Sequence, residues 1–169
     1  MKQVAQLLND MLACGVIQNY ALFGAMAQMR YTEAVATLDA DVLVAVPSAD
    51  RIDVLAGIYG FCKERGFETE GEAIRVGSWP VQFMPVFSSL TREAMENAEI
   101  ADFDGVPLRV VRADYLAVIA LSIRRGKDYA RILALLESLS VTREQISQLA
   151  SKHGLSQAWQ QFERRFSDE

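Results

Sequence analysis

Residues 37–46 read Thr37-Leu38-Asp39-Ala40-Asp41-Val42-Leu43-Val44-Ala45-Val46, and this stretch decides the fold prediction. Residues 42–46 form an apolar run, rich in β-branched side chains and followed by a proline, which predicts a buried strand. Two carboxylates, Asp39 and Asp41, stand at the entry of that strand. Side chains two residues apart on a strand point to the same face, so these two would converge.

Two like charges held this close repel each other unless a cation lies between them. A divalent cation that prefers oxygen ligands, Mg²⁺ above all, is the natural partner of such a pair. The spacing also has a second interpretation, in which the strand begins after Asp39 and both carboxylates are solvated turn residues. The two interpretations differ in whether a metal site exists.

The composition limits the class of protein. A chain of 169 residues is long enough for one domain with a small helical addition. Its hydrophobic share of 51% and charged share of 23% are ordinary for a protein with a buried core. The net charge of −5 argues against a nucleic-acid binder that uses its whole surface, but it leaves room for a local basic patch.

The sequence predicts a cytoplasmic protein with no membrane segment. No apolar run approaches the roughly 20 residues that span a bilayer, and the first residues lack the pattern of a signal peptide. Cys14 and Cys62 are far apart and lie in apolar helical patterns. We therefore predict two buried thiols in a reducing compartment.

Hydrophobic periodicity predicts an α/β fold with a mixed sheet flanked by helices, in residues 1–111, and a helical C-terminal part in residues 112–169. The predicted strands cover residues 19–23, 42–46, 67–72, 73–77, 79–87 and 107–111. The predicted helices cover residues 2–15, 24–29, about 51–65, 91–101, 113–123, 127–138, 142–153 and 157–166.

Local signals refine these predictions. Ser48-Ala49-Asp50 predicts the N-cap of the third helix, and Gly77-Ser78 predicts a hairpin turn. Pro80 and Pro85 predict that their strand is short or lies at an edge of the sheet. The sequence from Thr142 to Gln145 fits a capping box.

Three stretches together resemble a known family. They are Tyr20-Ala21-Leu22-Phe23-Gly24-Ala25-Met26-Ala27, Tyr31-Thr32-Glu33-Ala34-Val35-Ala36-Thr37-Leu38-Asp39-Ala40-Asp41, and Asp114-Tyr115-Leu116 through Arg125-Gly126-Lys127-Asp128. Within residues 20 to about 137, the chain resembles the minimal nucleotidyltransferases of the polymerase-β-like superfamily. The closest group is the AbiEii-type toxins of bacterial toxin–antitoxin systems, which show a glycine turn, an Asp-x-Asp strand and a later Arg-x-Lys-Asp element.

The resemblance implies a Mg²⁺-dependent transfer of an NMP group from an NTP to an RNA end, a protein or a small molecule. It assigns Asp39 and Asp41 as catalytic residues that hold Mg²⁺, and it implies an antitoxin-type protein partner. It assigns nucleotide binding to the glycine turn, the Asp-x-Asp segment and the later basic element: Gly24, Ala25, Thr37, Arg125 and Lys127.

Four positions depart from the family pattern. Ala25 stands where the family has Gly or Ser, Val35 where an Arg is usual, and Ala120 where a Lys is expected. Gln82 is the only counterpart of a third carboxylate found in many superfamily members. Losing an Arg and a Lys removes cations that would balance a triphosphate. The alternative prediction is therefore a catalytically degenerate protein that keeps the fold to bind a nucleotide or a protein partner.

The chain offers one source of replacement charge. Arg124, Arg125, Lys127 and Arg131 form a basic cluster, which could contact phosphates or RNA or could be a solvated turn between helices. We predict that Arg125 or Lys127 faces the Asp39/Asp41 pair; in the alternative, both lie in bulk water. Asp128 fits the family element and equally fits a helix cap.

The remaining candidates are predicted to be structural. His153 has no Cys or His neighbour at metal-ligand spacing, so it is predicted to be a surface or helix C-cap residue. Trp79, Trp159 and Phe162 are predicted to pack in the core, since the last two have helical spacing.

Overall fold

The computed structural model describes residues 1–47 and 53–166. Within these residues seven strands form one sheet: β1 (Asn19–Phe23), β2 (Ala40–Ala45), β3 (Glu68–Glu70), β4 (Ala73–Val76), β5 (Trp79–Pro85), β6 (Glu99–Phe103) and β7 (Val106–Val110). The helices of the same residues are α1 (Lys2–Ala13), α2 (Gly24–Gln28), α3 (Ala56–Glu64), α4 (Ser89–Glu96), α5 (Ala113–Ile123), α6 (Gly126–Glu137), α7 (Arg143–Lys152) and α8 (Ser156–Phe166). The predicted α/β class, with helices after the last strand, is confirmed.

Strand β2 lies at the centre of the sheet, whose order is β3-β4-β5-β2-β1-β7-β6. It pairs antiparallel with β1 and parallel with β5. Strand β1 also pairs parallel with β7, and the other neighbours are antiparallel. The predicted apolar run explains this position, because Val42, Leu43 and Val44 are completely buried.

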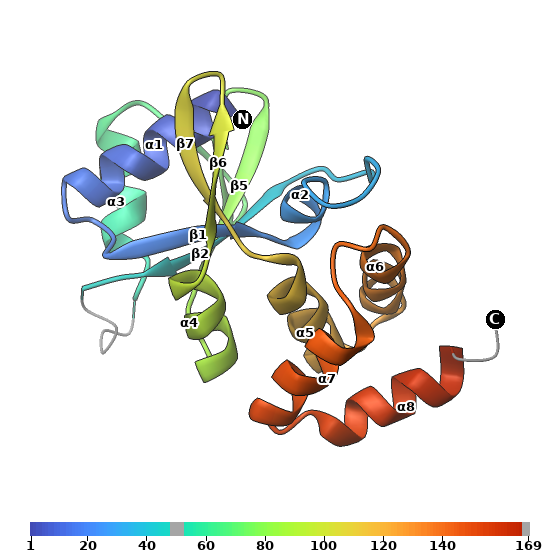
Figure 1. The fold of residues 1–169 in the computed structure, drawn as a ribbon. Helices are drawn as coiled ribbons and strands as arrows, with labels where there is room; N and C mark the ends of the chain where they lie inside the picture. Colours follow the sequence, from blue (N-terminus) through green and yellow to red (C-terminus); the bar gives the residue numbers. More distant parts are fainter. Residues whose placement is uncertain (48–52, 167–169) are drawn as a thin grey trace.

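Helices cover the sheet on both faces, and the helical C-terminal part lies on the side of α4 (Figure 1). Helix α1 lies on the opposite face, where the Tyr20 hydroxyl donates a hydrogen bond of 2.7 Å to Asn9 Oδ1. Helix α5 is buried along most of its length and packs against α2, α4, α6 and α7. It therefore joins the helical part to the sheet.

Strand β5 lies inside the sheet, so the prediction from Pro80 and Pro85 that it is short or at an edge is wrong. Both prolines lie where the strand has a single paired neighbour. Pro80 pairs with Arg75 of β4 before the pairing with β2 begins, and Pro85 pairs with Val44 of β2 after β4 has ended. A proline lacks the N–H group of a ladder, and at these ends that loss is tolerated.

The predicted helix over residues 91–101 is wrong in both of its ends. Helix α4 begins at Ser89, after an N-cap in which Ser88 and Thr91 form a capping box. It ends at Glu96, and β6 follows and forms a hairpin with β7. Only Ala101 of this edge strand is buried, so the strand lacks the apolar alternation that predicts one.

Two smaller predictions also need correction. Helix α3 begins at Ala56, later than the predicted start near residue 51, and the predicted Ser48-Ala49-Asp50 cap lies outside the described residues. Cys62 is buried as predicted, but Cys14 is exposed, because it is the C-cap residue of α1.

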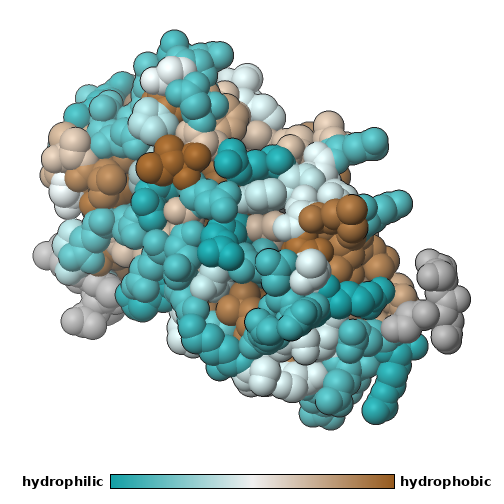
Figure 2. Space-filling model, viewed as in Figure 1, coloured by the Kyte–Doolittle hydropathy of each residue, from teal (hydrophilic) through white to brown (hydrophobic). Residues whose placement is uncertain are grey.

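The capping box at the start of α7 is confirmed, with Gln145 N donating to Thr142 Oγ1 at 3.2 Å. Trp159 and Phe162 are buried and stacked, as predicted for packing residues. Hydrophobic residues on the face in Figure 2 form separate patches within a largely hydrophilic surface. Every helix of the described residues is too short or too polar to span a bilayer.

Candidate active site

Asp41 lies at the entry of the central strand, beside two other strands. It is the second residue of β2, in register with Phe23 of β1 and Gln82 of β5. Asp39 lies just before the strand, and β2 begins at Ala40. Burial first and then the charge of Asp39 raise the pKa of Asp41 above its ordinary value, so the two carboxylates lie near enough for their charges to interact.

The carboxylate of Asp41 lies directly against the backbone of Gly24. The residue has a φ of +66°, in the left-handed region, at the turn from β1 into α2. A Cβ atom at this position would overlap Asp41 Oδ2 and lie 3.2 Å from Asp41 Cγ. Only glycine fits both constraints, so the glycine turn and the acidic strand form one unit. Ala25 follows in the first turn of α2.

Thr37 orients the other carboxylate. Its hydroxyl lies 3.1 Å from the backbone oxygen of Asp39 and 3.3 Å from Asp39 Oδ1, so its single proton can be donated to either oxygen. The Thr37 side chain thus links two residues of the segment before β2. This contact gives Thr37 a role in positioning Asp39.

The donor set at this point suits Mg²⁺. Two carboxylates, with Gln82 in register beside Asp41, offer side-chain oxygen atoms, which are the ligands that this ion prefers, and it usually completes its shell with waters and substrate phosphates. Burial first, and then the charge of Asp39, raises the pKa of Asp41, and a bound cation would favour the charged form of this carboxylate. In the described residues no group of three or more His, Cys, Asp or Glu side chains is arranged to hold a metal ion.

Three cations from the helical part act on Asp41. The charges of Arg131, Lys127 and Arg125, in that order, lower the pKa of Asp41 against the effects of burial and Asp39. Lys127 and Arg131 belong to α6, and Arg125 is its N-cap residue. The structure therefore brings the start of α6 toward the entry of β2. Arg124 lies on the C-cap of α5 with a φ of +63° and is exposed.

Arg125 is bound to Asp128 within its own helical turn. Arg125 Nε donates to Asp128 Oδ2 at 2.8 Å, and the same oxygen accepts the Arg125 backbone N–H at 3.0 Å. Asp128 is completely buried, whereas 56% of the Arg125 side chain is exposed. Asp128 therefore caps α6, as one of the two interpretations predicted, and it also holds the Arg125 side chain. Lys127 is exposed beside them.

Asp128 gives a stability prediction. Burial raises its pKa, but the hydrogen bonds and charges of Arg125 and Arg131 outweigh burial, so the pKa lies below its ordinary value. An acid with a lowered pKa stabilises the fold above its unfolded pKa and loses that effect as the pH falls through its folded pKa. Asp128→Asn should cost about 2 kcal/mol at pH 7, less than for a fully buried pair because Arg125 is half exposed.

Urea unfolding as a function of pH tests this prediction. The difference between wild type and Asp128→Asn should be constant near neutral pH and should shrink below the ordinary value of 3.8. Glu70→Gln is the control, because Glu70 pairs with Arg75 at the surface, where both side chains are about half exposed, and the change should alter stability by less than about 1 kcal/mol. Equal effects of the two substitutions would contradict the role of Asp128.

The positions that depart from the family pattern lie in different places. Gln82 directly neighbours Asp41 across the strand pair. Ala120 is completely buried in α5, where a lysine would have to place its charge in the core. Val35 is half buried in the segment between α2 and β2. Positions 35, 82 and 120 therefore supply no cation, and the cations that act on Asp41 come from the start of α6.

The sequence indicated Arg131 only as a member of the basic cluster, and it did not indicate Gln28 as a site residue. Arg131 Nε donates to Gln28 Oε1 at 3.0 Å, from residues 103 positions apart. The spacing of Asp128 and Arg131 by three residues on a helix could have indicated their pairing. Nothing in the sequence indicates the contact with Gln28.

A second polar cluster lies away from the acidic pair. Glu93 of α4 accepts hydrogen bonds from the Tyr115 hydroxyl at 2.7 Å and from Lys152 Nζ at 2.5 Å. His153 Nε2 lies 3.1 Å from Glu93 Oε2, and only 8% of the His153 side chain is exposed. His153 is the predicted C-cap residue, of α7, but it is not a surface side chain. A neighbouring hollow of about 790 Å³ contains none of the predicted site residues.

Comparison with known proteins finds a similar fold among solved structures. No protein-family model matches the chain, and no curated protein matches its sequence. The crystal structure of an antigenic nucleotidyltransferase-like protein from Paracoccidioides brasiliensis is similar, with 16% identity, a TM-score of 0.57, and coverage of 94% of this chain and 91% of that one. The solution structure of the antibiotic-resistance factor ANT(2'')-Ia has 13% identity and a TM-score of 0.51, covering 98% of this chain and 99% of that one. The chain therefore has a nucleotidyltransferase-like fold.

Proposed function

We propose that the protein is a Mg²⁺-dependent nucleotidyltransferase that moves an NMP group from an NTP to an acceptor. One observation carries the proposal: the Asp41 carboxylate rests on the Gly24 backbone, beside Asp39, and the charges of α6 act on it. The shared fold supports it. Two carboxylates beside a turn without a side chain support the proposal, because oxygen atoms are the ligands that Mg²⁺ prefers.

The residues of the chain would divide the work as follows. Asp39 and Asp41 would hold Mg²⁺, with the amide oxygen of Gln82 as a neutral third ligand. Bound Mg²⁺ supplies charge neutralisation and orientation of the phosphates. Lys127, exposed at the start of α6, would contact the triphosphate, and Arg125 would add charge from its pair with Asp128.

The transfer itself forms a bond between the acceptor oxygen and the α-phosphorus while the bond to the bridging oxygen breaks and pyrophosphate leaves. Gln82 is not a base, so it cannot take the acceptor proton, which would pass to water. Such a reaction depends on positioning and charge balance more than on covalent catalysis.

Transfer of label tests the proposal. NTPs labelled at the α-phosphate, incubated with cell RNA, protein extract or aminoglycoside-like small molecules, should label one of these acceptors. The Asp39→Ala and Asp41→Ala double variant should transfer none. Absence of transfer to every acceptor, or equal transfer by the double variant, would contradict the proposal.

Gln82 favours a second candidate function, that of a relative that binds a nucleotide or a protein partner without turnover. It places a neutral side chain beside Asp41, and the buried Ala120 and the uncharged Val35 supply no cation. Nucleotide binding that is equally tight with and without Mg²⁺, never followed by transfer, would favour this candidate. An AbiEii-type toxin role with an antitoxin-type partner is a further part of the proposal, and a neighbouring antitoxin gene would support it.

Gln82→Glu tests whether position 82 faces the metal. The substitution keeps the length of the side chain and adds a carboxylate next to Asp41. Without metal, the added repulsion should lower the melting temperature; with Mg²⁺, the extra charged ligand should enlarge the stabilising shift by about 1 kcal/mol or more. Thermal unfolding with EDTA and with Mg²⁺ measures both. Gln82→Met, which removes the oxygen, should reduce the shift, and identical shifts in all three proteins would contradict the assignment.

A further inference from the structure

Arg131 joins two elements that lie far apart in the sequence. Its Nε donates to Gln28 Oε1 at 3.0 Å, and its Nη1 lies 3.9 Å from Asp128 Oδ1. Only 14% of its side chain is exposed, Gln28 is 5% exposed and Asp128 is completely buried. A guanidinium with so little access to water depends on its protein partners, so this bridge is a fixed contact.

The two ends of the bridge belong to the two halves of the candidate site. Gln28 is the last residue of α2, the helix that begins at Gly24 under the Asp41 carboxylate. Asp128 lies in the first turn of α6, where it also holds Arg125. Figure 1 shows α6 beside the segment that contains α2. The bridge therefore crosses between the sheet and the helical part at the site itself.

The contacts of Arg131 hold its side chain in place. Its Nε donates to Gln28, its Nη1 faces the buried Asp128, and little of the side chain is exposed. Its partners leave it little freedom to move toward a ligand. A held cation of this kind can position its neighbours, whereas Lys127 remains exposed to meet a substrate.

We propose that Arg131 is a positioning residue for nucleotidyl transfer: held between Gln28 and Asp128, it fixes α6 against α2 and keeps Lys127 and Arg125 over the Asp39/Asp41 pair. This inference rests on the proposed function. It assigns to Arg131 part of the charge and order that the absent Arg at position 35 and Lys at position 120 would have supplied. The competing role is a purely structural contact with no effect on nucleotide binding.

Titration calorimetry with each of the four Mg·NTPs, on full-length variants, tests the inference. Arg131→Met should weaken the binding of the nucleotide that wild type binds by about tenfold or more, as for other residues that orient a site. Arg131→Lys keeps the charge but lacks the planar fork, so it should stay within about threefold of Arg131→Met. Gln28→Leu removes the acceptor and leaves Arg131 in place, so it should also weaken nucleotide binding. This variant decides the test if Arg131→Met fails to fold.

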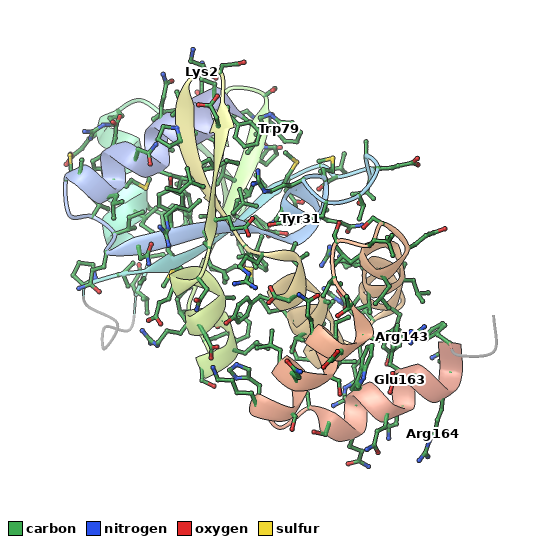
Figure 3. All side chains as sticks on the ribbon, viewed as in Figure 1. Lys2, Tyr31, Trp79, Arg143, Glu163 and Arg164 are labelled. Atoms are coloured by element: carbon green, nitrogen blue, oxygen red, sulfur yellow. The ribbon has the colours of Figure 1, made fainter. Side chains whose placement is uncertain are left out.

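Arg143→Met is the matched control. It removes the same charge from the helical part and breaks the pair with Glu163 at 4.0 Å between α7 and α8 (Figure 3). It should leave nucleotide affinity within about twofold of wild type, because this surface pair lies outside the candidate site. Hydrogen exchange of the nucleotide-free proteins adds an independent readout, and the amides of Met29 and Tyr31 at the end of α2 should exchange faster only when the bridge is broken.

The outcomes separate this inference from the proposed function. If wild type binds a nucleotide and Arg131→Met binds it equally well, the positioning role is overturned. Full recovery by Arg131→Lys would overturn it too, since charge alone would then suffice. If wild type binds none of the four nucleotides, the proposed function fails in wild type itself. In that case, faster hydrogen exchange in Arg131→Met would show only that Arg131 is a structural contact, and the positioning role would be overturned as well.

Discussion

Asp41→Asn is expected to reduce nucleotidyl transfer by at least about a hundredfold and, at the same time, to stabilise the metal-free protein. Residues that only orient a metal ligand cost about 10–100-fold, so loss of a charged ligand should cost more. The gain in stability follows from the raised pKa of Asp41, which means that the charged carboxylate is unfavourable in the fold. Label transfer and thermal unfolding in EDTA measure the two effects.

The pH dependence of the stability effect has a definite sign. Because the folded pKa of Asp41 lies above its unfolded value, the metal-free protein loses stability as the pH rises between the two values. The advantage of Asp41→Asn should therefore be complete at neutral pH and should vanish as the pH falls toward 3.8. Asp10→Asn, at an exposed position on α1, should change neither property. Loss of stability in Asp41→Asn would contradict the described environment of the carboxylate.

Gly24→Ala is the second prediction with a large effect. An alanine in the left-handed region costs about 1–2 kcal/mol by itself, and here its Cβ would also overlap Asp41 Oδ2. The carboxylate would have to move, and a displacement of about 1 Å in a catalytic group can cost about a hundredfold in rate. We expect both a loss of stability and a loss of transfer.

Gly15→Ala separates the two causes. Gly15 has a φ of +69°, close to that of Gly24, but nothing lies within 4 Å of a Cβ added there. The substitution should cost the backbone term of about 1–2 kcal/mol and leave transfer unchanged. Chemical unfolding and label transfer of both variants give the comparison. If Gly24→Ala behaved as Gly15→Ala does, the contact between the turn and Asp41 would have no functional weight.

Much of the fold could be predicted because its signals are local. The apolar run of β2 and the periodic helices α5 to α8 follow from side-chain spacing within each element. Strand β6 could not, because an edge strand with one buried residue carries no alternation. The inner position of β5 depends on which strands flank its prolines, and that is set by pairing between distant segments.

The candidate site divides in the same way. The spacing of Asp39 and Asp41 and the turn at Gly24 are local features of the sequence, so they could be proposed from it. The contact between Gly24 and Asp41 needs the antiparallel register of β1 and β2. The bridge from Arg131 to Gln28 needs two residues that are 103 positions apart in the sequence to meet. Tertiary packing alone supplies that information.

The dependence of nucleotide binding on Mg²⁺ tests the central claim most directly. Titration of each NTP into wild type and Asp41→Asn, with Mg²⁺ and with EDTA, isolates the role of the acidic pair. The account predicts that wild type binds one or more NTPs with Mg²⁺, that EDTA weakens this binding by about tenfold or more, and that Asp41→Asn binds as weakly with Mg²⁺ as wild type does with EDTA. Equal affinity in all four combinations, or no binding of any nucleotide to wild type, would contradict it.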